Sequence, residues 1–249
     1  LMLRAIERLG ALARRQGVAL RQSYARVARR ARREAARLLH GRGHSQGMRW
    51  LRKLRTYLGR VIRDVARKIE GDPAREAAFA ATLERARRIR LLALDVDGVL
   101  TDGRIYYDDR GAETKAFSTR DGLGMRLLAD NGVTLALITA RQSEIVARRA
   151  ANLGIEHVYQ GRNNKLDAFN HLLAETGLEE AQTCYAGDDW LDIPVLDRVG
   201  LAVTVADADP VVRNRVHWIT SRQGGHGAVR EICDLILAAQ GLDEGALER

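Results

Sequence analysis

Two carboxylates separated by one residue, Asp95 and Asp97, follow a run of apolar residues at 91–94. The run reads as a buried strand, and ligand sites in open α/β sheets form where such strands end. Burying two carboxylates at this spacing is costly without a cation. A D-x-D sequence is also compatible with a turn capped by its own side chains. The continuation Gly-Val-Leu-Thr-Asp-Gly after a strand favours a chemical site.

Further polar residues appear in order after later apolar runs. Thr139 follows VTLALI, and Arg141 stands just beyond it. Lys165 begins a helical pattern, and Asp188 and Asp189 follow TCYAG. Each is weak alone, because such residues are commonly helix caps or solvated side chains. Together they would place three carboxylates, a hydroxyl and an ammonium at one sheet edge. That set suits phosphoryl transfer, where catalysis is mostly positioning and charge neutralisation.

The elements that must position these residues follow from the hydrophobic pattern after residue 89. Short apolar runs alternate with amphipathic stretches, which predicts βαβ units and a parallel sheet covered on both faces. The predicted strands lie near 90–96, 133–139, 156–159, 183–186, 199–203 and 216–219. The predicted helices lie near 120–131, 142–153, 163–176, 189–197 and 226–240. The exception is 104–118, where two strand-like pieces flank a turn at Asp109-Arg110-Gly111, which predicts a projecting β-hairpin.

The chain before residue 90 has a different character. Residues 1–90 contain 25 Lys and Arg against 7 Asp and Glu, whereas the remainder is acidic overall. Helix is predicted over residues 1–40, over an amphipathic stretch near 51–69, and from Pro73 to about Arg90, with a glycine-rich break at 41–47. Such a basic segment favours polyanions, and the acidic part favours metal ions.

Composition narrows the protein class further. Two cysteines, Cys184 and Cys233, are too few for a disulfide framework, and each lies in an apolar run, so buried reduced thiols are expected. No run reaches the ~18 apolar residues of a membrane span, and no leader pattern is visible. We therefore expect a cytoplasmic protein.

The segments DVDGVLTDG, LITAR, Lys165 and GDDWLDIPV resemble the four motifs of the haloacid dehalogenase superfamily of phosphatases. The hairpin, KAFSTRDGLGMRLL, LGIEHVYQGRNNK and GGHGAVREICDLIL resemble its capless 3-deoxy-D-manno-octulosonate 8-phosphate phosphatases. The resemblance spans about residues 84–240. It implies a Rossmann-like α/β domain at 86–241, between a basic helical extension at 1–85 and a tail at 242–249. Nonulosonate 9-phosphate phosphatases share the capless form, so such a phosphatase or a broad sugar phosphatase stays an alternative.

The resemblance implies a role for each matching residue. Asp95 is the nucleophile that becomes an aspartyl phosphate. Asp97 protonates the leaving oxygen and then activates water. Thr139 and Lys165 hold the transferring phosphoryl oxygens.

The resemblance also implies a Mg²⁺ cofactor. Its ligands would be the carboxylates of Asp95 and Asp188 and the backbone carbonyl of Asp97. Asp189 and Asp192 would orient the metal site or Lys165.

Relatives of this kind have no cap domain and close their sites by assembly. The resemblance implies a homotetramer that packs through the hairpin at 104–118, and a phosphorylated sugar acid of lipopolysaccharide precursor synthesis as substrate. Arg120, Asp121, Arg141 and Lys165 would contact that substrate, since a guanidinium suits a carboxylate. Arg120 is also compatible with a plain solvated position at a helix start.

Two positions depart from the family pattern. His226 stands where Arg is expected, and a neutral imidazole does not replace a permanent cation. Ala140 replaces the usual Gly in LITAR and adds a methyl near the phosphate. Neither change touches Asp95, Asp97 or Asp188, so we expect activity to survive and substrate affinity to be the property affected.

The N-terminal segment resembles another family. LRQSYARVARRAR and the run LRTYLGRVIRDV are similar to the helical linker of insertion-sequence transposases, without their catalytic acids. Three interpretations stay open for residues 1–85: a passenger without a role, a nucleic-acid-binding segment with strong salt dependence, or a helical interaction module. A transposase-derived nucleic-acid-binding protein is the alternative of another class for the whole chain.

Overall fold

The computed structural model describes residues 73–241. Its strands are β1 (Leu91–Leu94), β2 (Tyr106–Tyr107), β3 (Glu113–Thr114), β4 (Thr134–Ile138), β5 (His157–Tyr159), β6 (Thr183–Ala186), β7 (Leu201–Thr204) and β8 (Trp218–Ile219). Its α-helices are α4 (Pro73–Ala86), α5 (Thr119–Asp130), α6 (Glu144–Leu153), α7 (Lys165–Thr176), α8 (Ile193–Leu196), α9 (Pro210–Arg213) and α10 (Ala228–Gln240). The 3-10 helices are η1 (Glu180–Gln182) and η2 (Trp190–Asp192).

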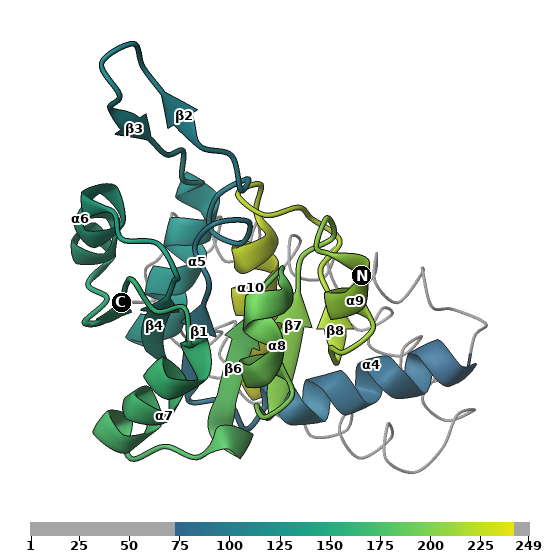
Figure 1. The fold of residues 1–249 in the computed structure, drawn as a ribbon. Coiled ribbons are helices and arrows are strands. Elements are labelled where there is room, and N and C mark those ends of the chain that lie inside the picture. The colour runs from purple at the N-terminus through teal and green to yellow at the C-terminus, as the bar shows by residue number, and fades with distance from the viewer. Residues whose placement is uncertain (1–72, 242–249) are drawn as a thin grey trace, which may run out of the picture. The chain divides into compact units, whose positions relative to one another are not determined.

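Six strands form one parallel sheet in the order β5-β4-β1-β6-β7-β8. All six were expected from the sequence, and the predicted α/β class is confirmed. Strand β1 lies in the middle, with β4 on one side and β6 on the other (Figure 1). The chain therefore changes direction beside β1, which is the topological switch point where ligands bind in such sheets.

The two faces of the sheet are buried under different helices. Along β1, Leu92 and Leu94 belong to a core that includes residues of α4, α5, α6 and α10. Leu91 and Ala93 face the opposite way, into a core with residues of α7, α8 and α9. This alternation is the period of two that a strand imposes. Because both faces are covered, every β1 side chain is apolar, as in other parallel sheets.

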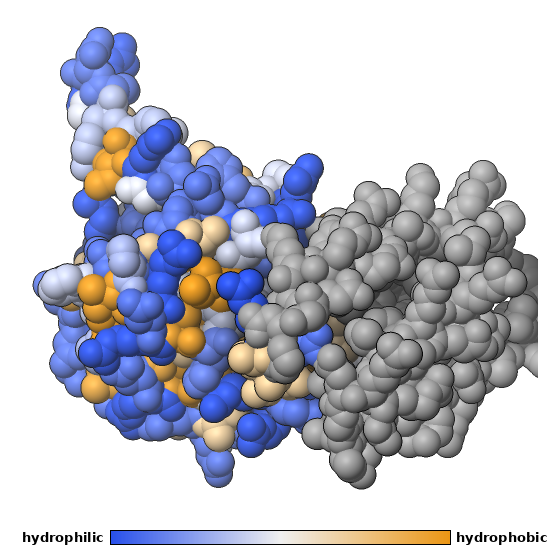
Figure 2. All heavy atoms as spheres, turned by 90° about the vertical axis from the view of Figure 1, so that its right-hand side faces the viewer, coloured by the Kyte–Doolittle hydropathy of each residue, from blue (hydrophilic) through white to orange (hydrophobic). Residues whose placement is uncertain are grey.

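The predicted hairpin is present between β1 and α5. Strands β2 and β3 pair in antiparallel fashion, with Tyr106 opposite Thr114. The turn is closed by Asp108, whose Oδ1 accepts hydrogen bonds from the backbone N–H groups of Arg110 (2.9 Å) and Ala112 (2.8 Å). The hairpin projects from the domain, and Figure 2 shows that its tip is hydrophilic.

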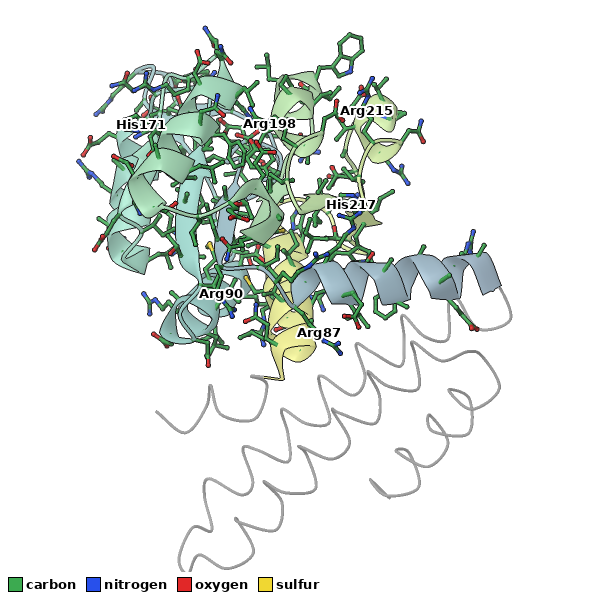
Figure 3. The ribbon with its side chains drawn as sticks, turned by 90° about the horizontal axis from the view of Figure 1, so that it is seen from below. Arg87, Arg90, His171, Arg198, Arg215 and His217 are labelled. Carbon is green, nitrogen blue, oxygen red and sulfur yellow. The ribbon has the colours of Figure 1, made fainter. Side chains whose placement is uncertain are left out.

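Helix α4 packs against the sheet domain although it precedes the predicted boundary at residue 86. Arg87, just after the helix, donates from Nε to the carbonyl of Ala239 in α10 (3.2 Å), beside which α4 lies (Figure 3). The Arg85 guanidinium donates to the carbonyl of Gly200 (2.8 Å). We infer that residues 73–86 belong with the sheet domain. The rest of the predicted basic extension and the tail at 242–249 lie outside the described residues.

Two smaller expectations concern thiols and membranes. Cys184 and Cys233 are buried and free, as predicted, and burial raises the pKa of both thiols. Within residues 73–241, no helix combines the length and the apolar character that crossing a membrane requires.

Candidate active site

Asp95 occupies the first position after β1, at the switch point of the sheet. Its side chain is almost fully buried, with 6% of the residue exposed. Its backbone N–H donates to the carbonyl of Ala186 (2.9 Å), so the ladder with β6 continues to the site. Its Oδ1 accepts from the N–H of Val96 (2.7 Å). The carboxylate is thus fixed by the strand that carries it.

Lys165 connects two buried carboxylates. It is the first residue of α7, which Asn164 caps, and it is 3% exposed. Its Nζ lies 2.8 Å from Asp95 Oδ2 and 2.7 Å from Asp192 Oδ1. Burial lowers the pKa of Lys165, but the charges of Asp95 and Asp192 outweigh burial and leave that pKa raised. The residue is therefore an ammonium held at the floor of the site.

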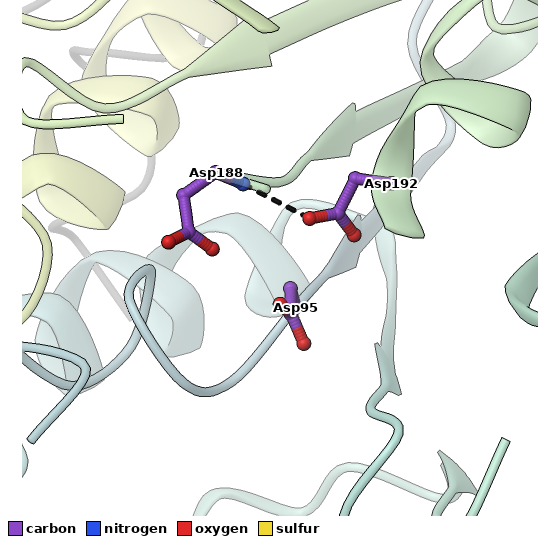
Figure 4. A group of neighbouring side chains, drawn as sticks. All are labelled: Asp95, Asp188 and Asp192. Carbon is purple, nitrogen blue, oxygen red and sulfur yellow. Dashed lines mark hydrogen bonds between the residues drawn. The ribbon is translucent and has the colours of Figure 1, made fainter. Parts of the chain in front are cut away.

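Asp192 uses both of its oxygens within the fold. Oδ1 also accepts from the hydroxyl of Tyr185 (2.6 Å), and Oδ2 accepts from the backbone N–H groups of Asp188 (3.0 Å) and Asp189 (3.1 Å). Figure 4 shows the bond from Asp188. Asp192 is fully buried and accepts from four donors, as expected of a residue that orients its neighbours. One of its oxygens also lies close enough to those of Asp95 and Asp188 to contact a shared metal ion.

Asp188 has the opposite character. Among the described residues, its buried Oδ1 has no hydrogen-bond partner. One carboxylate oxygen from each of Asp95, Asp188 and Asp192 lies within 4.8 Å of the others (Figure 4). With Lys165 these residues form what we call the sheet cluster. When all three carboxylates are ionised, they and the one ammonium leave two negative charges, which a divalent cation would neutralise. The donor set and the free oxygen of Asp188 therefore fit Mg²⁺, a cation that prefers carboxylate oxygens.

Gly98 allows the loop after β1 to approach this site. A Cβ at Gly98 would lie 2.0 Å from Asp188 Oδ2, and the residue has φ +93°, a conformation that other residues rarely adopt. A Cβ at Gly224 would lie 1.7 Å from the carbonyl oxygen of Gly98. Two glycines thus let the loop before α10, the Asp95 loop and Asp188 pack directly on one another.

The electrostatics of the sheet cluster follow from its burial. Burial, with the charge of Asp192 adding to it, raises the pKa of Asp95 to about 7 despite the opposing effect of Lys165. Burial and the charge of Asp95 raise the pKa of Asp188 to about 8. Without a cation the cluster therefore holds protons more tightly than ordinary carboxylates. A cation that favours the ionised forms would compete with those protons.

Thr139 is 2% exposed at the residue after β4, the strand beside β1. Its Oγ1 accepts a hydrogen bond from the backbone N–H of Arg141 (3.3 Å). The hydroxyl proton is therefore free to donate to a ligand at the same sheet edge.

Asp97 belongs to a second group, which we call the hairpin cluster: Asp97, Glu113, Lys115 and Arg141. Lys115 Nζ forms a short ion pair with Asp97 Oδ1 and lies 3.2 Å from Glu113 Oε1. On the other side, Arg141 Nη2 donates to Glu113 Oε2 (3.1 Å), and its Nε lies 3.8 Å from Asp97 Oδ2. Sequence reasoning did not single out Glu113 or Lys115, because charged residues on a two-stranded hairpin ordinarily face water.

Three predicted residues lie apart from these contacts. Arg120 is exposed in the first turn of α5, and its substrate contact remains a prediction. Asp189 is exposed, and its Oδ1 accepts from the N–H of Trp190 (2.7 Å), which caps η2. His226 is exposed in the loop before α10.

Asp121 behaves differently from its predicted substrate contact. It is 1% exposed, and its two oxygens accept from the backbone N–H groups of Gly227 (3.2 Å) and Arg230 (2.7 Å). Asp121 therefore joins α5 to the start of α10. In this arrangement it supports the loop that packs on Gly98, and a role through that loop fits its geometry better than direct contact.

The chain is similar to known proteins in sequence and in fold. Residues 152–232 match the family described as haloacid dehalogenase-like hydrolase. A 3-deoxy-D-manno-octulosonate 8-phosphate phosphatase of Yersinia pestis is 49% identical over 164 residues, which are 66% of this chain and 88% of the relative. The corresponding phosphatase of Escherichia coli K12 is 50% identical over 166 residues, with the same two shares.

Solved structures show the same likeness. The Moraxella catarrhalis 3-deoxy-D-manno-octulosonate 8-phosphate phosphatase, in complex with a magnesium ion, a phosphate ion and KDO, is 43% identical. It matches with a TM-score of 0.65 over 66% of this chain and 94% of that chain. The Yersinia pestis phosphatase structure is 48% identical, with a TM-score of 0.66 over 66% and 89%.

Proposed function

Because this chain belongs to the 3-deoxy-D-manno-octulosonate 8-phosphate phosphatases of the haloacid dehalogenase-like hydrolases, we propose that it hydrolyses that sugar-acid phosphate. The products are the free sugar acid and phosphate, in lipopolysaccharide precursor synthesis. The observation that carries the proposal in the structure is the sheet cluster: a buried carboxylate at the switch point, paired with a buried ammonium.

Asp95 is the proposed nucleophile. A carboxylate oxygen attacks phosphorus as the bond from phosphorus to the sugar oxygen breaks, and Asp97 gives that oxygen a proton. Water then attacks phosphorus, and Asp97 takes the proton of the water. The bond from phosphorus to the Asp95 oxygen breaks, which releases phosphate and restores the Asp95 carboxylate. Lys165 and Thr139 hold the phosphoryl oxygens, so that developing charge meets donors already in place.

Mg²⁺ is the cofactor of the proposed reaction. Asp95 and Asp188 would hold it by their carboxylates and Asp97 by its backbone carbonyl, while Asp192 orients Lys165. When bound there, Mg²⁺ would supply the positive charge that the carboxylates and the phosphoryl oxygens need for neutralisation. This assignment agrees with the free oxygen of Asp188 and with the two unbalanced negative charges of the sheet cluster.

The test is a substrate panel with Mg²⁺ that compares kcat/KM for octulosonate 8-phosphate with that for a nonulosonate 9-phosphate. We expect the octulosonate to be preferred. Asp95→Asn should lower kcat at least ~10³-fold, as removal of a nucleophile does. Asp197→Asn, a matched change of an exposed carboxylate that pairs with Arg215, should leave kcat unchanged. Retained activity in Asp95→Asn would contradict the nucleophile assignment.

We further propose a homotetramer that packs through the hairpin, and a cytoplasmic location. Ile105, Tyr106 and Tyr107 support the assembly, because these large side chains of the hairpin are 40%, 45% and 62% exposed. For residues 1–85 we propose no activity, and nucleic-acid binding stays the alternative. Light scattering of the full chain would test the assembly.

A further inference from the structure

The four side chains of the hairpin cluster form a ring of alternating charges, of which Asp97 is a member. Going round the ring, Asp97 contacts Lys115, Lys115 contacts Glu113, Glu113 contacts Arg141, and Arg141 approaches Asp97 again. Two carboxylates and two cations make the ring neutral. Asp97 is therefore held from two sides by residues that its own loop does not contain.

Lys115 is the least exposed member of the ring. Its side chain has no exposed surface, whereas those of Asp97 and Glu113 are each 20% exposed and that of Arg141 is 40% exposed. Removing an ammonium from water is expensive, and an apolar residue of similar size often serves stability as well or better. A buried lysine between two carboxylates is therefore not explained by the needs of packing.

The ring also distinguishes the two oxygens of Asp97. Oδ1 faces the Lys115 ammonium, which can only donate. Oδ2 has no hydrogen-bond partner among the described residues, and the Nε of Arg141 lies 3.8 Å from it, beyond hydrogen-bond distance. A proton on Asp97 therefore belongs on Oδ2, because Oδ1 already accepts from Lys115.

On these grounds we propose that Lys115, held by Glu113, is a positioning residue for the proton donor Asp97. Lys115 fixes Oδ1, and the rotation of the carboxylate about its Cβ–Cγ bond is thereby set with Oδ2 toward the sugar oxygen. The inference rests on the proposed phosphatase function and deepens it. Among the described residues Lys115 pairs with Asp97 and Glu113 and not with the nucleophile Asp95. Up to release of the leaving group, its removal should therefore affect only the proton transfer by Asp97.

The experiment compares two substrates on the full-length enzyme with Mg²⁺. The alcohol of octulosonate 8-phosphate needs a proton to leave, whereas the nitrophenolate of 4-nitrophenyl phosphate leaves without one. We compare kcat/KM, which covers the steps up to release of the leaving group and excludes the hydrolysis of the aspartyl phosphate that both substrates share. In Lys115→Met we expect kcat/KM for octulosonate 8-phosphate to fall about 10- to 100-fold, part of the ~10²–10⁴-fold that general acid catalysis contributes. The kcat/KM for 4-nitrophenyl phosphate should change less than about threefold.

Control variants test whether the substrate-selective loss arises from the contact between Lys115 and Asp97. Asp97→Asn should show the same selective loss in kcat/KM, because it removes the proton donor itself, and its kcat should fall for both substrates, because Asp97 also activates the water. Lys115→Arg keeps the charge and should recover part of the lost activity. Arg213→Met, which removes an exposed cation of α9, should leave both substrates unaffected. Light scattering should show the same assembly for Lys115→Met and the parent chain.

Equal losses of kcat/KM on both substrates would overturn the proposal, since Lys115 would then act on phosphoryl transfer or on the whole site. Unchanged activity on both would overturn it as well. If Lys115→Met does not fold, Glu113→Gln decides by the same comparison, because it removes one carboxylate partner of Lys115 while keeping its shape. A parent chain inactive on both substrates would instead refute the proposed function.

Discussion

The sheet cluster and the hairpin cluster are two ways of holding carboxylates in one site. In the sheet cluster the residues sit at the ends of buried elements, and negative charge exceeds positive charge by two. In the hairpin cluster the charges balance and the side chains are partly exposed. The difference indicates that the first is built to receive a cation and a phosphoryl group. With both carboxylates ionised the second has balanced charges, so it needs no added cation, and its contacts fix the orientation of Asp97.

Among the changes that test this comparison, Lys165→Met should have the largest effect. It leaves Asp95 and Asp192 buried without their shared cation, which typically costs about 3–5 kcal/mol of unfolding free energy. We expect kcat to fall about 10²–10³-fold on every phosphate ester, since a phosphoryl-binding cation is lost.

Denaturant unfolding and the two-substrate assay would measure both effects. The matched control is Arg198→Met, which breaks an exposed ion pair with Glu180 and should cost no more than about 1 kcal/mol. If Lys165→Met lowered kcat for octulosonate 8-phosphate but not for 4-nitrophenyl phosphate, the two clusters would not differ in function as proposed.

A second prediction concerns pH and the metal. The pKa values of Asp95 and Asp188 are raised from an ordinary 3.8 to about 7 and about 8, so the folded metal-free chain binds protons more tightly than the unfolded chain. Their stabilising effect is therefore fully present below the unfolded pKa of 3.8, is lost progressively as pH rises, and is gone above about 8.

Thermal unfolding at several pH values would check this. Without Mg²⁺, Tm should fall as pH rises across that window. Added Mg²⁺ should raise Tm more at the alkaline end, because it binds the ionised carboxylates. In Asp188→Asn the Mg²⁺ effect should shrink at every pH. A Mg²⁺ effect that weakens as pH rises would contradict the assigned ligands.

Asp121→Asn tests a residue that reaches the site through the backbone. An amide replaces one of two acceptor oxygens, so we expect a loss of about 1–3 kcal/mol in unfolding free energy. If Asp121 only supports the loop before α10, kcat for both phosphates should fall together and by less than about tenfold. A rise in KM for octulosonate 8-phosphate alone would instead favour the predicted direct contact.

The smallest expected effect is that of His226→Arg. A permanent cation at this exposed loop position should lower KM for octulosonate 8-phosphate by about three- to tenfold, the scale of one charged hydrogen bond. kcat and the KM for 4-nitrophenyl phosphate should not change, because that ester has no carboxylate to bind. Arg104→Met, an exposed basic residue of the hairpin stem, serves as the charge control.

Sequence reasoning located all six sheet strands and the hairpin, and it missed the short helix α9. Strands were found because apolar runs are local signals, whereas α9 spans only four residues, Pro210–Arg213. Asp95, Thr139, Lys165 and Asp188 could be grouped in advance, since parallel strands bring their carboxyl ends to one edge. Lys115 could not, because nothing in a two-stranded hairpin signals that a lysine will be buried.

The sequence by itself therefore determined the parallel sheet and the chemistry available at its edge, through residue types and the periods of apolar positions. Only the tertiary structure decided which charged side chains form ion pairs. Lys165 meets Asp192 across 27 positions, and Lys115 meets Asp97 across 18. The physical reason is that the packing of buried elements, and not the separation along the chain, decides which carboxylate oxygens accept hydrogen bonds. Both oxygens of Asp192 accept hydrogen bonds, whereas Asp188 and Asp97 each have one oxygen without a partner among the described residues.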